Sequence, residues 1–255
     1  MVGTTLADFF LKTSLTDSQT SVVKKLEQFL SNSNHVFILK GYAGTGKTFM
    51  LGGLRQYLDS IDRPYCFVAP TGRAAKVLRK KTKCAAFTIH SLIYQLDTKE
   101  SRMDIDSDGN YKLYFKKRVN EYPLNTVFIV DESSMVSDTY SESESMKFGS
   151  GKLLSDFIGF VDCKGTNRKV LFLGDHVQLP PVNSKLSPAL SQEYLTQSFG
   201  LRCEEHELTD VYRQAQNSGI LQTSMHIRNA IHEQCRLNLD MRLPVIKVKE
   251  GNGRM

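Results

Sequence analysis

A glycine-rich segment near residue 41 carries the residue types that hold phosphate. It reads Gly-Tyr-Ala-Gly-Thr-Gly-Lys-Thr and satisfies the pattern G-x-x-x-x-G-K-[ST]. Glycines let the backbone curl so that N–H groups point inward, and a helix beginning at Lys47 would add partial positive charge. Lys47 would supply a cation for the β- and γ-phosphates, and the Thr48 hydroxyl would ligate Mg²⁺. The alternative is a glycine-rich turn with an incidental lysine. The predicted nucleotide-binding residues of this loop are Gly41, Ala43, Gly44, Thr45, Gly46, Lys47 and Thr48.

Two carboxylates, Asp131 and Glu132, follow the apolar run at 127–130. In a parallel sheet the carboxyl ends of the strands form the ligand-binding edge. An acidic pair there is costly unless a cation or water balances its charge. We expect Asp131 to hold Mg²⁺ and Glu132 to orient or deprotonate an attacking water. The alternative for Asp131 is an N-cap of the following turn.

Short apolar runs and amphipathic segments must position these residues. The runs are rich in β-branched and aromatic residues and lack strict alternation, as is typical of strands buried on both faces. They cover residues 35–40, 65–69, 125–130 and 169–173. Amphipathic helical patterns cover residues 17–30, 47–58 and 73–80. Strands that alternate with helices predict an α/β fold with a mainly parallel central sheet.

One stretch departs from this rhythm. Apolar residues alternate on both sides of Asp108-Gly109, which is a β-hairpin signal. We predict a small inserted β-hairpin subdomain at residues 99–122, within a domain formed by residues 1–98 and 123–237. The Ser/Glu-rich segment 137–150 is expected to be an exposed loop.

The composition is that of a globular protein. The chain has 255 residues, of which 40% are hydrophobic and 24% charged, so wholesale disorder is excluded. The net charge of +6 permits a polyanionic partner without proving one. Five scattered cysteines without a CxxC pair argue against a zinc site and for reduced thiols in the cytoplasm. No window approaches the length of an apolar membrane span, and the N-terminus has no signal-peptide pattern.

Further motifs follow in order along the chain. They are APTGRAAK at 69–76, TIHS at 88–91, DESSM at 131–135, GDHVQLPPV at 174–182 and YRQ at 212–214. Together with the glycine-rich loop they resemble the RecD-like branch of the superfamily 1 DNA helicases, over about residues 14 to 235. The resemblance implies a RecA-like P-loop NTPase domain that uses ATP and Mg²⁺. It also implies 5′→3′ translocation on single-stranded DNA by the intact protein.

The resemblance also implies roles for three polar residues. Gln178 resembles the γ-phosphate sensor, with an ordinary polar loop residue as the alternative. Arg213 resembles an arginine that contacts the γ-phosphate, with a surface salt bridge as the alternative. Gln19 resembles the glutamine that contacts adenine. Thr16 and Gln19 also fit a capping box, and one amide serves both partners only in part.

Positions that match the family's DNA contacts are Thr71, Arg73, Thr88 and His90. The basic stretch at 73–83 would attract DNA phosphates, and its alternative is a solvated helix end whose cations suit the helix dipole. For His90 the alternative is a structural histidine. The hairpin aligns with the family's pin, which meets the duplex junction.

Relatives of this kind continue into a second RecA-like domain, and residues 238–255 resemble a linker that is cut short. We expect that domain to be missing here and to act in cis or in trans, so that this chain alone is a weak or inactive motor. Two rival functions stay open. One is a phosphoryl-transfer kinase; the other is a nucleotide-gated nucleic-acid-binding P-loop protein without independent helicase activity. Stimulation of ATP turnover by single-stranded DNA would favour the motor.

Overall fold

The computed structural model describes residues 4–11, 13–42, 44–99, 112–178, 180–181, 184 and 187–210. All of them belong to the first of two compact units, Met1–Asp210. Ala43, Arg213, the Asp108-Gly109 turn and the linker at 238–255, which the sequence analysis singled out, lie outside the described residues.

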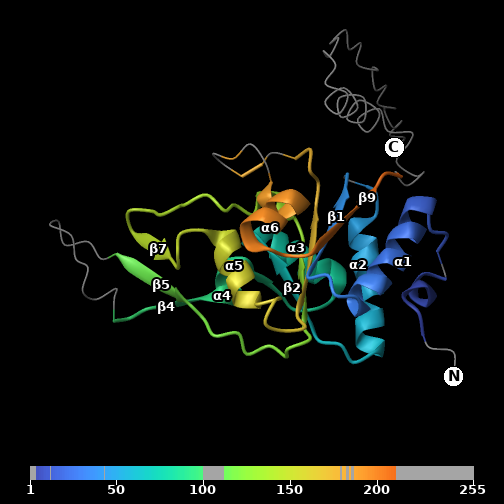
Figure 1. Ribbon diagram of the computed structural model, residues 1–255, viewed down its shortest axis with the longest axis horizontal. Helices are drawn as coiled ribbons and strands as arrows, with labels where there is room; N and C mark the ends of the chain where they lie inside the picture. The colour runs from blue at the N-terminus through green and yellow to red at the C-terminus, as the bar shows by residue number, and fades with distance from the viewer. Residues whose placement is uncertain are drawn as a thin grey trace, which may run out of the picture. The chain divides into compact units, whose positions relative to one another are not determined.

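The central sheet is the main layer of this unit. In the described part of the chain it has six strands in the order β3-β2-β6-β8-β1-β9, and every neighbouring pair is parallel (Figure 1). The strands are β1 (Val36–Gly41), β2 (Tyr65–Ala69), β3 (Ala86–Thr88), β6 (Val127–Val130), β8 (Lys169–Gly174) and β9 (Cys203–Leu208). The four apolar runs are confirmed as β1, β2, β6 and β8, and the predicted α/β fold with a parallel sheet is correct.

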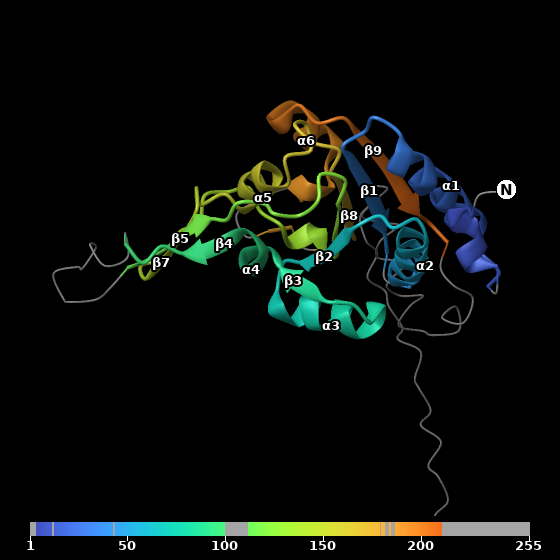
Figure 2. The same ribbon diagram turned by 90° about the horizontal axis from the view of Figure 1, so that it is seen from below.

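Helices cover both faces of the sheet. They are α1 (Asp17–Ser31), α2 (Lys47–Ser60), α3 (Gly72–Thr82), α4 (Ile89–Ile93), α5 (Leu153–Val161) and α6 (Gln192–Phe199). Figure 2 shows α2 and α3 on one side of the sheet and α5 and α6 on the other. The predicted helices at 17–30, 47–58 and 73–80 are therefore confirmed as α1, α2 and α3.

Alternate residues of each central strand enter different cores. In β1, Phe37 and Leu39 pack with α1 and α2, whereas Val36 and Ile38 pack with α5 and α6. All four side chains are fully buried. This two-sided burial explains why the strands are continuous apolar runs, and it holds their carboxyl ends, with the loops that follow, in fixed positions.

A second, smaller sheet accompanies the central one. Its described strands are β4 (Tyr94–Leu96), β5 (Leu113–Lys117) and β7 (Met146–Phe148), with β5 antiparallel to β4 and parallel to β7. The predicted insertion at 99–122 thus contributes β5, whereas β4 and β7, the two described strands that pair with β5, lie outside that range.

The expectation of an exposed loop at 137–150 is wrong at β7. Phe148 stacks on Phe115 of β5 with ring centroids 4.5 Å apart, and both side chains are half-buried. One aromatic ring in a polar stretch therefore supplies the apolar contact that holds this strand to the small sheet.

Candidate functional site

The glycine-rich loop joins the end of β1 to the start of α2, in the strand–loop–helix order that the sequence predicts. Gly44 and Gly46 have φ values of +85° and +95°, a region that side-chain-bearing residues rarely adopt. At Gly41 a Cβ atom would lie 2.7 Å from the Thr45 hydroxyl. The three glycines therefore permit a curled backbone at the N-terminus of α2, which is the geometry that suits an anion.

Lys47, the first residue of α2, lies over this loop. Its ammonium donates hydrogen bonds to the carbonyl of Gly41 and, at 3.1 Å, to that of Tyr42. The positive charge is thus held beside the backbone groups that would meet a phosphate. Thr48, the next residue, lines the same cavity as Lys47.

The acidic pair follows β6 directly. The backbone N–H of Asp131 donates to Val68 on β2 at 3.0 Å, and its carboxylate accepts from the N–H of Glu132 at 3.0 Å. Glu132, not Asp131, is the N-cap residue of the 3₁₀ turn Ser133–Met135, and no side-chain hydrogen bond caps that turn. Its φ of 55° is left-handed, which is strained for a glutamate. Such strain is concentrated at functional sites.

Burial sets the electrostatics of these carboxyl groups. It is the main cause that raises the pKa of Asp131. The pKa of Glu132 is also raised, first by burial and then by the charge of Asp131. The positive charges of Lys47 and Lys81 act in the opposite direction on both groups. The site therefore places two partly buried carboxyl groups near two lysines.

A cavity of about 690 Å³ brings these elements together. Its lining residues include Gly44, Gly46, Lys47, Thr48, Thr71, Arg73, Lys81, Asp131, Glu132 and Gln178. Gln178 comes from the loop after β8, and its side-chain oxygen lies 3.3 Å from the Ser134 hydroxyl, beside the acidic pair. Segments from the ends of four parallel strands thus share one cavity.

The donor set in this cavity fits a hard divalent cation. Within the described ranges, no group of three or more His, Cys, Asp or Glu side chains forms a metal site by itself. Thr48 and Asp131 instead offer one hydroxyl and one carboxylate. Mg²⁺ is usually held by one or two such groups together with water and substrate phosphate. The residues present therefore fit a Mg²⁺ ion that binds together with a nucleotide.

Gln19 reaches the phosphate loop from α1. Its side chain is 1% exposed, its Nε2 donates to the Thr45 carbonyl at 3.0 Å, and its Oε1 accepts from the Thr16 N–H at 3.2 Å. The capping box with Thr16 is therefore present. The amide also contacts the loop, a role that the sequence analysis did not anticipate.

The four residues assigned to DNA fall into two groups. Thr71 and Arg73 line the same cavity as Lys47, and the Thr71 hydroxyl caps α3 by accepting from the Ala74 N–H. Thr88 caps α4 through the Ser91 N–H at 3.0 Å and does not line this cavity. His90 packs edge-on against Phe148, with ring centroids 5.0 Å apart, and burial lowers its pKa. His90 thus has the packing of the structural alternative.

Lys81 is a site residue that the sequence analysis treated only as part of a basic stretch. Its ammonium lies 3.5 Å from the Thr48 hydroxyl. Ala74, Val77 and Lys81 all line the cavity, and their spacing of three and four residues places them on one face of α3. That spacing was the available signal.

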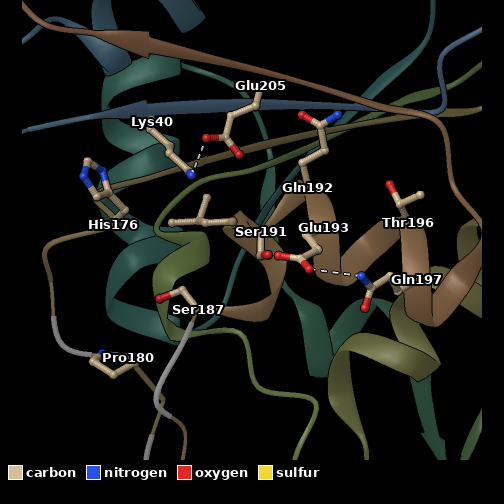
Figure 3. Close-up of a pocket in the computed structure, with 11 residues that line it drawn as sticks. Lys40, His176, Pro180, Ser187, Ser191, Gln192, Glu193, Thr196, Gln197 and Glu205 are labelled. Carbon is tan, nitrogen blue, oxygen red and sulfur yellow. Dashed lines mark hydrogen bonds and ion pairs between the residues drawn. The ribbon is translucent and has the colours of Figure 1, made fainter.

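Another cavity, of about 770 Å³, lies beside α6 (Figure 3). It is lined by Lys40 of β1 and Glu205 of β9, which form an ion pair at 2.5 Å, and by polar residues of α6. His176 and Pro180 reach it from the GDHVQLPPV segment, but it contains none of the predicted catalytic or nucleotide-binding residues. The cavity of about 690 Å³ that Lys47 and Asp131 line is therefore the candidate site.

Known proteins are similar to this chain. The chain is 26% identical over 239 residues to the ATP-dependent RecD2 DNA helicase of Deinococcus radiodurans, covering 94% of the chain and 27% of that protein. It is also 26% identical to the ATP-dependent DNA helicase dda of phage T4, covering 94% of the chain and 46% of that protein. The chain therefore spans less than half the length of these two relatives.

A solved structure has the same fold. The Pif1 helicase from Candida albicans matches 91% of this chain and half of its own length, with a TM-score of 0.51 and 18% sequence identity. The model of a family described as "AAA domain" matches residues 14–143, which include the phosphate loop and the acidic pair. The chain belongs to this AAA domain family and is a RecA-like domain of the superfamily 1 helicases.

Proposed function

We propose that this chain is the ATP-binding motor domain of an ATP-dependent 5′→3′ DNA helicase. The observation that carries the proposal is the single cavity in which the phosphate loop, the Asp131–Glu132 pair and Gln178 meet. A triphosphate requires positive charge and inward N–H groups, and its hydrolysis requires a base for water. This cavity brings together the ammonium of Lys47, the N-terminus of α2 and the carboxyl group of Glu132.

Each residue has a specific task in this proposal. Lys47 and the loop backbone bind the phosphates, while Thr48 and Asp131 hold Mg²⁺, which neutralises phosphate charge when bound. Glu132 positions the attacking water and accepts its proton. Gln178, beside Ser134, senses the γ-phosphate. Arg213, which lies outside the described residues, is proposed as a second γ-phosphate contact. Gln19 is proposed to meet adenine with the hydrogen-bonding capacity that its amide retains.

DNA would be held by the residues that precede and begin two helices. Thr71 and Arg73 at the start of α3 line the nucleotide cavity, so this helix is placed to respond to the nucleotide. Thr88 and His90 at the start of α4 would continue the path of a single strand. Hydroxyls and cations are common partners of DNA phosphates.

Translocation in this proposal depends on a partner domain. Two RecA-like domains must open and close around ATP to move along a strand, so a second such domain acts in cis or in trans. Among the described residues, no helix has the length and apolar character needed to cross a membrane. The cytoplasmic location stays a prediction that rests on the scattered cysteines.

The test is ATP turnover with and without single-stranded DNA, with Lys47→Ala as the control for the phosphate loop. Turnover that rises with DNA and disappears in Lys47→Ala supports the motor. Tight, ATP-dependent DNA binding without turnover, even after a second RecA-like domain is supplied, would favour a nucleotide-gated binder. Strand-displacement substrates with 5′ or 3′ tails, used with the two-domain protein, decide the direction.

A further inference from the structure

Lys81 places a second ammonium group at the phosphate side of the cavity. It lies in the last turn of α3, and its Nζ is 3.5 Å from the hydroxyl of Thr48. Thr48 is one of the two residues, with Asp131, that we propose hold Mg²⁺. The positive charge of Lys81 therefore lies next to the position at which the metal's charge would act.

The neighbouring cations of the basic stretch differ from Lys81 in their surroundings. Arg79 donates to the carbonyl of Ala86 at 2.9 Å, outside the cavity. Lys80 does not line the cavity. Within the described part of the chain, the hydrogen bond of Lys81 is the one to Thr48, and Lys81 forms no ion pair that would hold it elsewhere.

The charge balance of the cavity also involves Lys81. Asp131 and Glu132 bring two partly buried carboxyl groups to the site, and the charges of Lys47 and Lys81 both act on them. Lys47 is bound to the carbonyls of Gly41 and Tyr42 on the loop. Lys81 comes from α3, and its ammonium lies 3.5 Å from the Thr48 hydroxyl. The two ammonium groups thus reach the phosphate position from different elements.

We propose that Lys81 supplies, in the absence of a divalent cation, the positive charge that Mg²⁺ supplies at Thr48, so that the cavity binds nucleotide without metal. The inference rests on the proposed nucleotide-binding function. An ammonium group has three donors for phosphate oxygens and a flexible four-carbon stem. Lys81 can therefore bind phosphate when no metal is present and withdraw when Mg²⁺ takes that place.

The experiment measures equilibrium binding of a fluorescent ATP analogue to the full chain, once in excess EDTA and once in excess Mg²⁺. Lys81→Met keeps the length of the stem and the helix propensity but removes the charge. We expect about tenfold weaker binding in EDTA, as for a lost charge-assisted hydrogen bond, and less than about threefold in Mg²⁺. Lys80→Met is the matched control, and it should change binding by less than about twofold in both conditions.

The outcomes separate this inference from the proposed function. Wild-type protein that binds in Mg²⁺ but not in EDTA overturns the role of Lys81, as does an equal loss for Lys81→Met in both conditions. If Lys80→Met lost the same affinity in EDTA alone, the proposal would also be overturned, because any positive charge near the cavity would then have the effect assigned to Lys81. Wild-type protein that is folded by circular dichroism but binds in neither condition contradicts the proposed function itself.

Discussion

The side-chain amide of Gln19 connects the N-terminus of α1 to the phosphate loop, because its Nε2 donates to the backbone carbonyl of Thr45 at 3.0 Å. The other end of the amide accepts from the Thr16 N–H. A Cβ atom at Gly46 would lie 2.6 Å from Nε2, so the loop approaches the amide closely. Gln19 therefore supports the loop in the absence of any nucleotide.

This contact predicts that Gln19→Ala destabilises the protein without nucleotide. The change removes the hydrogen-bond partner of the buried Thr45 carbonyl and of the half-buried Thr16 N–H, at a cost of about 1–3 kcal/mol. Urea unfolding measures the loss. Thr16→Ala is the control, because it removes the cap but not the contact to Thr45, and should cost about 1 kcal/mol.

The same variant also tests adenine recognition. If Gln19 acts only through the loop, Gln19→Ala weakens ATP and GTP binding by the same factor. A selective loss of ATP affinity would instead show that the amide contacts the base. Competition binding with the two nucleotides distinguishes these results.

Glu132→Gln should retain ATP binding while turnover falls at least about 100-fold, since the amide cannot accept the proton of water. Burial and the charge of Asp131 raise the pKa of Glu132. In the wild type, turnover should therefore decline as the pH falls through this raised pKa and the carboxylate becomes protonated. Single-turnover rates measured across a range of pH show this decline. Unchanged turnover in Glu132→Gln would remove this residue from the mechanism.

Asp131→Asn should stabilise the protein at neutral pH. The pKa of Asp131 is raised in the folded state, chiefly by burial, so the folded protein binds this proton more tightly than the unfolded chain does. The free energy of unfolding therefore falls as the pH rises from the pKa of Asp131 in the unfolded chain to its raised pKa in the folded protein. At higher pH the lost stability is not regained. Asparagine removes the charge and keeps an oxygen for the Glu132 N–H.

We expect a melting temperature about 2–4 °C higher for Asp131→Asn at pH 7, together with weaker Mg²⁺-dependent nucleotide binding. Differential scanning calorimetry at pH 7 and near pH 4 measures the effect. The gain should shrink at the lower pH, because the raised pKa of Asp131 makes the wild-type carboxyl group protonated more often there than at pH 7. A variant that is less stable at pH 7 contradicts the prediction.

The sequence predicted the centre of this fold better than its edges. β1 and β8 are apolar on both faces, so their residue types alone indicate buried strands. β9 reads Cys-Glu-Glu-His-Glu-Leu and is the last strand of the sheet among the described residues, and charged side chains are tolerated in such an edge strand. β3 has only three residues and gives no periodic signal.

The site shows the same division. Lys47, Asp131 and Glu132 lie where strand ends must meet, and motif spacing therefore predicted them. Whether Lys81 reaches the cavity depends on how α3 is rotated about its axis relative to the loop. The spacing of residues 74, 77 and 81 suggests this rotation but does not determine it. The second contact of Gln19 depends on how α1 packs against the loop, a tertiary relationship that the capping pattern does not contain.

Asp156 connects all three described strands of the small sheet to α5, a helix that packs on the central sheet. Its carboxylate is 2% exposed and accepts from the Tyr94 hydroxyl of β4 at 2.7 Å. It also accepts from the Ser150 N–H, just after β7, at 2.8 Å, and lies 3.4 Å from the Lys117 ammonium of β5. One buried carboxylate thus has a partner in or next to each strand.

Asp156→Ala should therefore loosen the small sheet more than the central one. It leaves the buried Tyr94 hydroxyl unpaired, at a cost of about 1–3 kcal/mol, and it removes the acceptor of the N–H of the exposed Ser150. Tyr94→Phe removes a single hydrogen bond and should cost about 1 kcal/mol. Tyr140→Phe, at an exposed tyrosine, is the control and should change stability by less than about 0.5 kcal/mol. Native-state hydrogen exchange measures the effect strand by strand. Equal loss of protection in β1 and β5 would show that Asp156 stabilises the whole unit rather than the attachment of the small sheet.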